Sequence, residues 1–452
     1  MAGKTRKFSL WTFADRFEGD KVVWIILLML CMISIVCMFS STSRLLDGDA
    51  TRLDLVKEQA LYVAIGLAVI IGLYNIRDIK WFRRASMLCF PASFLLLLML
   101  DLHIDTPVVR ALYINGAYRI LSVGGIQVHV FEVVKVAMVL YLAWALDAFK
   151  KGTLKGAGLK PIWKKIIYIY APFIITFVMV IPGSNSSALF IGAIMFLVIL
   201  LGGGNFKDLL ILAAAGLLII GVCVGIYNIS EGKSMERIGT AISRLTETHD
   251  WEAQFLGSPR GSDEYQEALD AIRQPYSAKI AIHEGGLFGK GPGQSTQRYV
   301  VPDISEDYMF SFIIEEYGLF GGILVICLYV SLMARGSIIV RNCRDLYAKL
   351  CVAGLCLLIS GQAFLHMFVN ADIGPMTGQT LPMISHGTSA FLCFCAAFGV
   401  ILSLSRIAAR RIAEEARLAA SMMGGDGSAS DSSGNMKENT EDDGIQETQS
   451  DN

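Results

Sequence analysis

The sequence has few charged residues, and this shortage argues against a soluble globular fold. Asp, Glu, Lys and Arg make up only 17% of its 452 residues, whereas 54% are hydrophobic. A soluble globular chain carries about 25% charged residues, so the composition indicates a membrane protein that crosses the bilayer several times. Nothing in the charge pattern indicates nucleic-acid binding.

Motifs that would indicate other classes of protein are also missing. The ten cysteines have no CxxC or other metal-binding spacing, and most lie within hydrophobic stretches. They are therefore predicted to be small packing residues, without a disulfide. The first hydrophobic stretch follows a polar start and lacks a small-residue cleavage site, so it predicts a spanning helix and not a removed signal peptide. The sequence contains no clear internal repeat and no separate soluble domain.

Long hydrophobic stretches are abundant. About 17–25 apolar residues cross one bilayer as a helix, and the predicted fold is all-α, a polytopic membrane protein with ten transmembrane helices. These helices are expected at approximately Val22–Ser41, Gln59–Tyr74, Ala85–Leu102, Val128–Leu146, Ile166–Ile181, Ser187–Leu201, Leu209–Tyr227, Tyr308–Ala334, Lys349–Val369 and Thr388–Ser405.

The positive charges between these stretches predict the orientation. Lys and Arg cluster before the first stretch and after the second, fourth, eighth and tenth. With ten spans all these clusters fall on one face, which the positive-inside rule assigns to the cytoplasm. Both termini are then cytoplasmic, and one large extracytoplasmic loop lies at 228–305.

The predicted domains are a cytoplasmic N-terminus at 1–21, a membrane domain at 22–406 and a cytoplasmic tail at 407–452. From about residue 424 the tail has almost no apolar residues, which is typical of disorder. Within the outer loop, 234–273 is charged and predicted to be partly helical. The segment 285–295 is so rich in glycine that it predicts a compact irregular turn.

Asp307 is the first candidate for a catalytic residue. It directly precedes the eighth stretch, in PDISEDYMFSFIIEE, and is therefore expected at the outer membrane boundary. A carboxylate partly shielded from water by lipid and protein has a raised pKa, which suits a general base. The alternative is an ordinary helix start, in which Ser305 and Glu306 provide the N-cap and a first-turn acid.

Glu132 and Lys135 lie three residues apart near the outer end of the fourth stretch. This spacing places them on one helical face, where they can form an ion pair. Ionisable groups inside a membrane usually mark a functional cavity. The alternative is a pair that only offsets its own desolvation.

Several cations lie on the outer side, against the positive-inside bias. They are candidates for binding an anionic lipid diphosphate, and solvated loop charges are the alternative. These cations are Arg119, Arg273, Lys279, Lys290 and Arg298.

Glu315 and Glu316 lie about two turns into the eighth stretch and predict a buried polar contact. The Gly/Pro-broken segment 370–389 predicts either a cavity wall or a re-entrant turn.

Taken together, these residues resemble the SEDS family (shape, elongation, division and sporulation), closer to its FtsW than its RodA branch. The match extends from about residue 22 to 406. The family's outer-loop motif, GG-x-x-G-x-G-x-G-x-S followed by LPE-x-H-TDFIF and EE-x-G, falls on 285–318, with its catalytic aspartate on Asp307 and its LPE glutamate on Asp303. The arginine of its GA-x-R-W motif falls on Arg119. The glutamate and lysine of its QPSE-x-x-K motif fall on Glu132 and Lys135, and its SYGGSS motif falls on the segment that contains Ser385.

The sequence departs from these motifs at flanking polar positions. Ser305 and Glu306 replace the histidine and threonine before the aspartate, and His386 replaces the tyrosine of SYGG. The segment 182–188 lacks the aspartate of a QPDLGTA-like run. These departures concern the neighbours of Asp307 and leave its expected role unchanged.

The resemblance implies a peptidoglycan glycosyltransferase that polymerises lipid II at the outer face of the bacterial cytoplasmic membrane, for septal cell-wall synthesis in cell division. A class B penicillin-binding protein and other divisome proteins are the expected partners. A lipid II flippase or transporter and a non-catalytic divisome scaffold remain alternatives. A divalent cation (Mg²⁺ or Mn²⁺) is a candidate cofactor, without nameable ligands. The expected catalytic residue is Asp307, and the expected substrate-binding residues are Arg119, Glu132, Lys135, Lys290, Arg298, Asp303 and Ser385.

Overall fold

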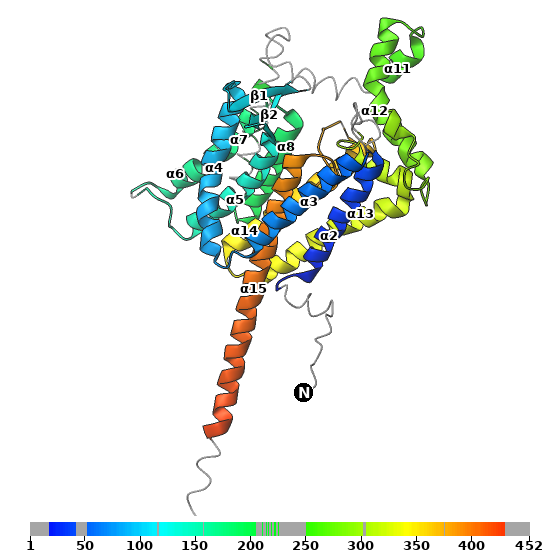
Figure 1. Ribbon diagram of the computed structural model, residues 1–452. Coiled ribbons are helices and arrows are strands. Elements are labelled where there is room, and N and C mark those ends of the chain that lie inside the picture. The colour runs from blue at the N-terminus through cyan, green and yellow to red at the C-terminus, as the bar shows by residue number, and fades with distance from the viewer. Residues whose placement is uncertain are drawn as a thin grey trace, which may run out of the picture. The chain divides into compact units, whose positions relative to one another are not determined.

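The computed structural model describes residues 18–41, 52–114, 117–156, 158–204, 250–301, 304–374 and 376–429, with isolated positions between 210 and 225. The protein is mostly helical, with one small sheet (Figure 1). In chain order its elements are α2 (Lys21–Ser41), α3 (Arg52–Tyr74), α4 (Ile79–Asp101), β1 (Val109–Ile114), β2 (Ala117–Val123), β3 (Ile126–His129), α5 (Val130–Lys150), α6 (Pro161–Lys165), η2 (Ile166–Tyr170), α7 (Ala171–Val180), α8 (Asn185–Leu201), α11 (Asp250–Gly257), α12 (Asp263–Gly285), η3 (Gln297–Tyr299), α13 (Met309–Asn342), α14 (Leu346–Asn370) and α15 (Thr388–Ala429).

The prediction of a multi-pass membrane protein is confirmed. Seven of the described helices are long and apolar enough to cross a membrane: α2, α3, α4, the α6–α7 segment, α13, α14 and α15. Helix α8 is a shorter apolar helix, and α5 coincides with the fourth predicted span but carries three charged residues before its last turn. The seventh predicted span falls largely outside the described residues, so the number of ten stays a prediction.

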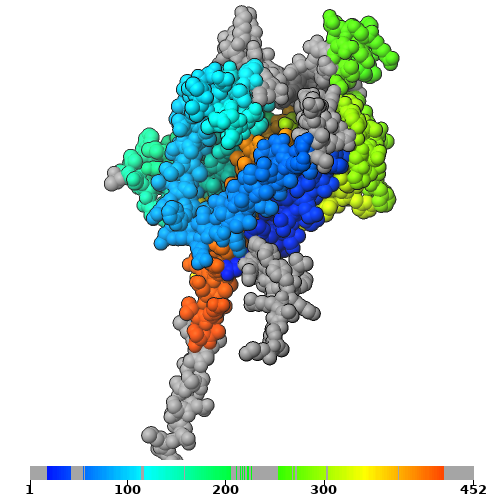
Figure 2. Space-filling model, viewed as in Figure 1, coloured from blue at the N-terminus to red at the C-terminus, as the bar shows by residue number. Residues whose placement is uncertain are grey.

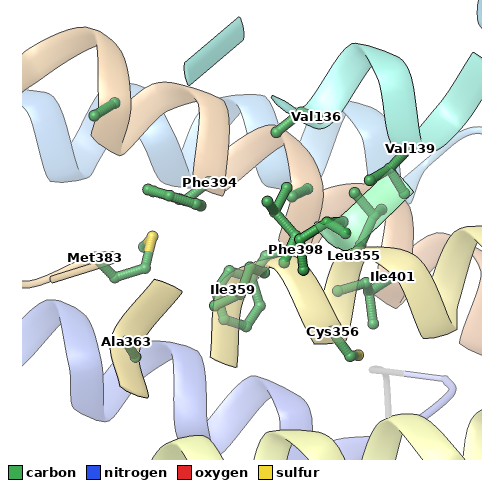
Figure 3. Packing of buried hydrophobic residues seen from close by; sticks show 14 of the residues in the cluster. Val136, Val139, Leu355, Cys356, Ile359, Ala363, Met383, Phe394, Phe398 and Ile401 are labelled. Carbon is green, nitrogen blue, oxygen red and sulfur yellow. The ribbon is translucent and has the colours of Figure 1, made fainter. Parts of the chain in front are cut away.

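The core lies where α5, α14 and the first part of α15 meet. Val136 and Val139 of α5 pack with Leu355 and Ile359 of α14 and with Phe398 of α15 (Figure 3). Aromatic and aliphatic side chains of this size contribute about 1.5–3 kcal/mol each when they are fully buried. This packing makes α14 and α15 the most buried of the spanning helices.

The peripheral helices combine a buried face with an exposed apolar face. In α2, for example, Leu27 and Leu30 are buried, whereas Ile25 and Met32 are 56% and 67% exposed. Helices α2, α3 and α4 lie over the face seen in Figure 2. A helix that is apolar all round is typical of a membrane span, because lipid covers the side that protein does not.

Asp20 connects three helices near the start of α2. Its carboxylate accepts the backbone N–H groups of Val22 and Val23 at 3.0 and 3.2 Å, which caps α2. It also pairs with Arg335 of α13 at 2.6 Å. Its own backbone N–H donates to Ser405 Oγ of α15 at 2.9 Å.

An antiparallel sheet of order β1-β2-β3 precedes α5. These three strands were not predicted from the sequence. The signal was present, because the two residues between β2 and β3 are Gly124 and Gly125, both with positive φ (59° and 89°), as a type I′ hairpin turn requires. The sheet places Arg119 on its central strand, and β3 leads directly into α5.

Helix α13 breaks at Gly318, where φ is 70° and ψ is −174°. The glycine-rich loop inserts into the gap and replaces the lost helical hydrogen bonds. Lys290 and Gly291 donate backbone N–H groups to the carbonyls of Glu315 and Glu316 at 2.9 and 3.0 Å, and the Leu319 N–H donates to Gly286 O at 3.0 Å. The compact irregular turn predicted for this loop is therefore confirmed.

The chain divides into two units, Met1–Ala408 and Ala409–Asn452, and α15 contains residues of both. The α15 helix includes residues 424–429, where the sequence favoured a disordered tail; residues 430–452 lie outside the described part. The loop that was predicted to be extracytoplasmic contains helices α11 and α12, and Ser262 caps α12 by accepting the Tyr265 N–H at 3.2 Å.

Every cysteine that the structure describes is a free thiol.

Candidate active site

A small polar cavity of about 150 Å³ lies where the sheet, the starts of α5 and α8, the turn before α13 and the segment before α15 meet. Such a site combines residues that are far apart in the sequence. Its lining residues are Arg119, Ile120, His129, Phe131, Glu132, Ser184, Ser187, Glu306, Asp307, Gly378, Gln379, Thr380, His386, Gly387 and Ala390. Asp307, Arg119 and Glu132, all predicted site residues, therefore face one cavity.

Asp307 lies in the turn that precedes α13, and the turn does not act as an ordinary helix N-cap. Helix α13 begins at Met309, and its N-cap is Tyr308, whose side chain makes no capping hydrogen bond. Gly378, with φ at 59°, passes so close that a Cβ there would lie 3.5 Å from Asp307 Oδ2. The Asp307 carboxylate thus lines the cavity, and Asp307 is not the N-cap residue of α13.

Helix α14 supplies the caps that the turn does not provide. The Phe310 N–H donates to His366 Nε2 at 3.3 Å, and the Ser311 N–H donates to Asn370 Oδ1 at 2.9 Å. Asn370 Nδ2 in turn donates to the carbonyl of Asp307 at 3.0 Å. His366 and Asn370 are buried, so these bonds form without competition from water and fix the backbone of Asp307.

The segment before α15 holds the same turn from the other side. Ser385 Oγ donates to the Glu306 carbonyl at 2.7 Å and accepts the Leu381 N–H at 2.9 Å. The His386 N–H donates to Ser305 O at 2.9 Å. Ser385 was predicted to bind substrate, but the structure places its hydroxyl on the backbone of the Asp307 turn. Ser385 does not line the cavity.

Arg119 reaches the cavity from β2. Its Nε donates to the carbonyl of Gly183 at 3.2 Å, which orients the guanidinium. A guanidinium presents further N–H donors in a planar fork, so Arg119 can bind an anion in the cavity while it keeps this contact. The sequence analysis identified Arg119, and the sheet that positions it was missed.

The predicted Glu132–Lys135 pair is confirmed, at 2.6 Å. The Lys135 ammonium also donates to Gln362 and Gln379 at 2.7 and 2.8 Å, which uses its three N–H donors. Lys135 is buried and does not line the cavity, whereas Glu132 does. The Lys135 ammonium therefore orients Glu132, which lines the cavity. Glu132 Oε2 is buried without a hydrogen-bond partner among the described residues.

Lys290 and Arg298, both predicted to bind substrate, lie elsewhere, in the network around the break in α13. Lys290 Nζ donates to Glu315 at 2.8 Å and also contacts Glu284. Although burial opposes the charged form, these acids raise the pKa of Lys290. Arg298 is buried and donates to Ser40 O at 3.2 Å. The structure does not bring either cation to the cavity.

The same network confirms the buried polar contact predicted for Glu315 and Glu316, which are 0% and 1% exposed. Glu315 Oε2 accepts from Ser295 Oγ at 2.5 Å. Glu316 Oε1 accepts from Ser40 Oγ at 2.5 Å and from the Gly293 N–H at 3.1 Å. These carboxylates fasten the glycine-rich loop to α13.

The remaining predicted residues lie outside the cavity or outside the described chain. Lys279 pairs with Asp372 at 2.5 Å, and Arg273 lines an apolar groove between α11 and α12. Asp303 lies outside the described residues, as does the glycine of the predicted GA-x-R turn. Within the described chain no three His, Cys, Asp or Glu side chains could hold a metal ion together. The divalent cation therefore stays a prediction without assigned ligands.

Several cavity residues were missed because their role depends on contacts distant in sequence. Gln379 receives a hydrogen bond from Lys135 and donates to Ser187 Oγ at 3.0 Å. Ser184 and Ser187 lie in the segment that lacks the family's aspartate. Isolated serine and glutamine residues carry no sequence signal, so only the fold could identify them.

Comparison with known proteins shows the family. A family model described as "Cell cycle protein", named for FtsW, RodA and SpoVE, matches residues 20–410. The chain belongs to this family. Stage V sporulation protein E of Bacillus subtilis is 27% identical over 398 residues, which is 86% of this chain and 97% of that protein. A protein of Thioalkalivibrio sulfidiphilus named "Probable peptidoglycan glycosyltransferase FtsW" is 31% identical over 357 residues, which is 78% of this chain and 80% of that protein.

Solved structures share the FtsW/RodA/SpoVE fold. A chain in a structure described as a peptidoglycan synthase complex matches with a TM-score of 0.60 and 19% identity, over 86% of this chain and 98% of that chain. RodA of Thermus thermophilus matches with a TM-score of 0.52 and 19% identity, over 86% of this chain and 97% of that chain. At this identity the likeness shows the fold alone.

Proposed function

We propose that this protein is a peptidoglycan glycosyltransferase that polymerises lipid II into glycan strands. The observation that carries the proposal is the cavity in which Asp307, Arg119 and Glu132 meet, in a chain of the FtsW/RodA/SpoVE family. Relatives that bear the name peptidoglycan glycosyltransferase support the same activity.

In the proposed reaction, Asp307 takes the proton of the acceptor sugar's 4-hydroxyl while that oxygen attacks the anomeric carbon of the donor. The new C–O bond forms opposite the breaking bond to the polyprenyl diphosphate, so the anomeric carbon is inverted. Arg119 balances the negative charge of the leaving diphosphate. Glu132, oriented by Lys135, accepts a hydrogen bond from a sugar hydroxyl through Oε2, which has no partner among the described residues.

The size of the cavity limits what it can hold. At about 150 Å³ it is smaller than a typical ligand pocket, which has about 300–1,000 Å³. It therefore accommodates the reacting groups, while the lipid chain and the peptide lie outside it. The exposed apolar faces of the spanning helices are a suitable environment for the lipid chain.

The proposal includes the setting of the reaction. The protein is placed in the bacterial cytoplasmic membrane with both termini inside, because its Lys/Arg clusters then follow the positive-inside rule. A class B penicillin-binding protein is the proposed partner, supported by the likeness to a chain of a peptidoglycan synthase complex. Septal synthesis, together with other divisome proteins, is the proposed role, and imaging of a tagged copy in dividing cells tests it.

The decisive experiment is polymerisation of fluorescent lipid II by the purified protein with its penicillin-binding partner. Asp307→Asn should abolish polymer, because the amide cannot accept the hydroxyl proton. Asp105→Asn is the matched control: Asp105 pairs with Arg110 at 2.8 Å, is 71% exposed and does not line the cavity. The control should polymerise like the wild type, and both variants should unfold at the wild-type temperature and bind the partner.

Three outcomes would contradict the proposal. Polymer formation by Asp307→Asn would remove Asp307 from the mechanism. Movement of lipid II across liposome membranes, with no polymer from the wild type, would instead indicate a transporter. Partner activation without polymer or transport would indicate a scaffold.

A further inference from the structure

Two residues at which the chain departs from its family motifs contact each other at the cavity. Glu306 precedes Asp307, and His386 lies in the segment before α15. The imidazole Nδ1 lies 3.7 Å from Glu306 Oε1, and both residues line the cavity. This distance permits an ion pair when the histidine is protonated.

The backbone holds the pair in place independently of the two side chains. The His386 N–H donates to Ser305 O at 2.9 Å, and Ser385 Oγ donates to Glu306 O at 2.7 Å. Substitution of either side chain leaves both bonds intact. The side chains of Glu306 and His386 are 49% and 25% exposed, so protons from solvent can reach them.

The other charged groups that face the pair come from every wall of the cavity. They are Arg119 of β2, His129 of β3, Glu132 of α5 and Asp307 of the turn before α13. Lys135 compensates Glu132. Two carboxylates, those of Glu306 and Asp307, then share the cavity with the guanidinium of Arg119.

We propose that His386 sets the charge balance of the cavity: as an imidazolium it compensates Glu306 and thereby allows an anionic diphosphate to bind beside Arg119. Without this compensation, Glu306 and Asp307 together repel that ligand. The inference rests on the proposed function for the identity of the ligand.

The test measures binding of a fluorescent polyprenyl diphosphate to the purified protein in detergent at pH 6. His386→Ala should weaken binding by about fivefold, the upper range for a partly exposed ion pair. The matched control is His283→Ala, which removes an exposed histidine of α12 that does not line the cavity.

The double variant separates charge compensation from a purely structural role. In the Glu306→Gln background there is no carboxylate to compensate, so adding His386→Ala should weaken binding less than about twofold. The same fivefold loss in both backgrounds, a wild-type affinity in His386→Ala, or no binding of the probe would each overturn the inference. None of these results bears on lipid II polymerisation or on its loss in Asp307→Asn, which are measured separately.

Discussion

Replacing Lys135 with methionine tests the buried charge network beside the cavity. The Lys135 ammonium donates to Glu132, Gln362 and Gln379 at 2.6, 2.7 and 2.8 Å, and its side chain is fully buried. Methionine keeps the apolar part of the side chain and removes all three donors. The carboxylate of Glu132, only 13% exposed, then has no compensating charge.

The expected loss of stability is large. Removing one partner of a buried ion pair costs about 3–5 kcal/mol, because the other charge stays buried. We therefore expect Lys135→Met to lower the free energy of unfolding by about 4 kcal/mol. In Glu132→Gln/Lys135→Met the buried charge is absent, but Gln362 and Gln379 still lack a donor. The double variant should recover about half of the loss, since an unpaired amide costs about 1 kcal/mol or more.

Lys57→Met is the matched control. Lys57 and Asp54 have the same i,i+3 spacing and lie 2.9 Å apart, but their side chains are 75% and 52% exposed. This variant should change stability by less than about 0.5 kcal/mol. Equilibrium unfolding in mixed micelles measures all three variants. The reasoning is refuted if Lys135→Met is as stable as Lys57→Met, or if the double variant is no more stable than Lys135→Met.

Two further substitutions test how α13 is built. Gly318→Ala should lower the free energy of unfolding by about 2 kcal/mol or more in the same assay, because φ is 70° and the new Cβ would lie 2.2 Å from Leu287 O. In the control Gly72→Ala the new Cβ has no atom within 4 Å, so the free energy of unfolding should stay the same or rise slightly. Equal effects of the two substitutions would contradict this reasoning. Asn370→Ala removes the side-chain N–H that donates to the carbonyl of Asp307. It should therefore lower the kcat of lipid II polymerisation at least about tenfold, with a smaller change in KM. An unchanged kcat would show that this hydrogen bond does not position the Asp307 carboxylate.

The long hydrophobic stretches predicted most helices because a membrane span needs little beyond length and apolar composition. The same logic failed in the segment before α5, where β1, β2 and β3 are short and their pattern is weak. Of the residues that the sequence singled out, Asp307, Arg119 and Glu132 share a cavity, whereas Lys290 and Arg298 belong to the network around Glu315 and Glu316. The sequence position of a lysine or arginine does not reveal which carboxylate it contacts in the folded protein.

By itself, the sequence determined that the chain spans a membrane, that Glu132 and Lys135 pair, and that glycine forms an irregular turn, because each depends on composition or on neighbours within one helical turn. Only the tertiary structure decided that α14 caps α13, that Lys135 does not line the cavity, and that Glu306 contacts His386. These contacts join residues distant in the chain, and their partners are selected by the packing of whole helices. Local sequence preferences carry no information about that packing.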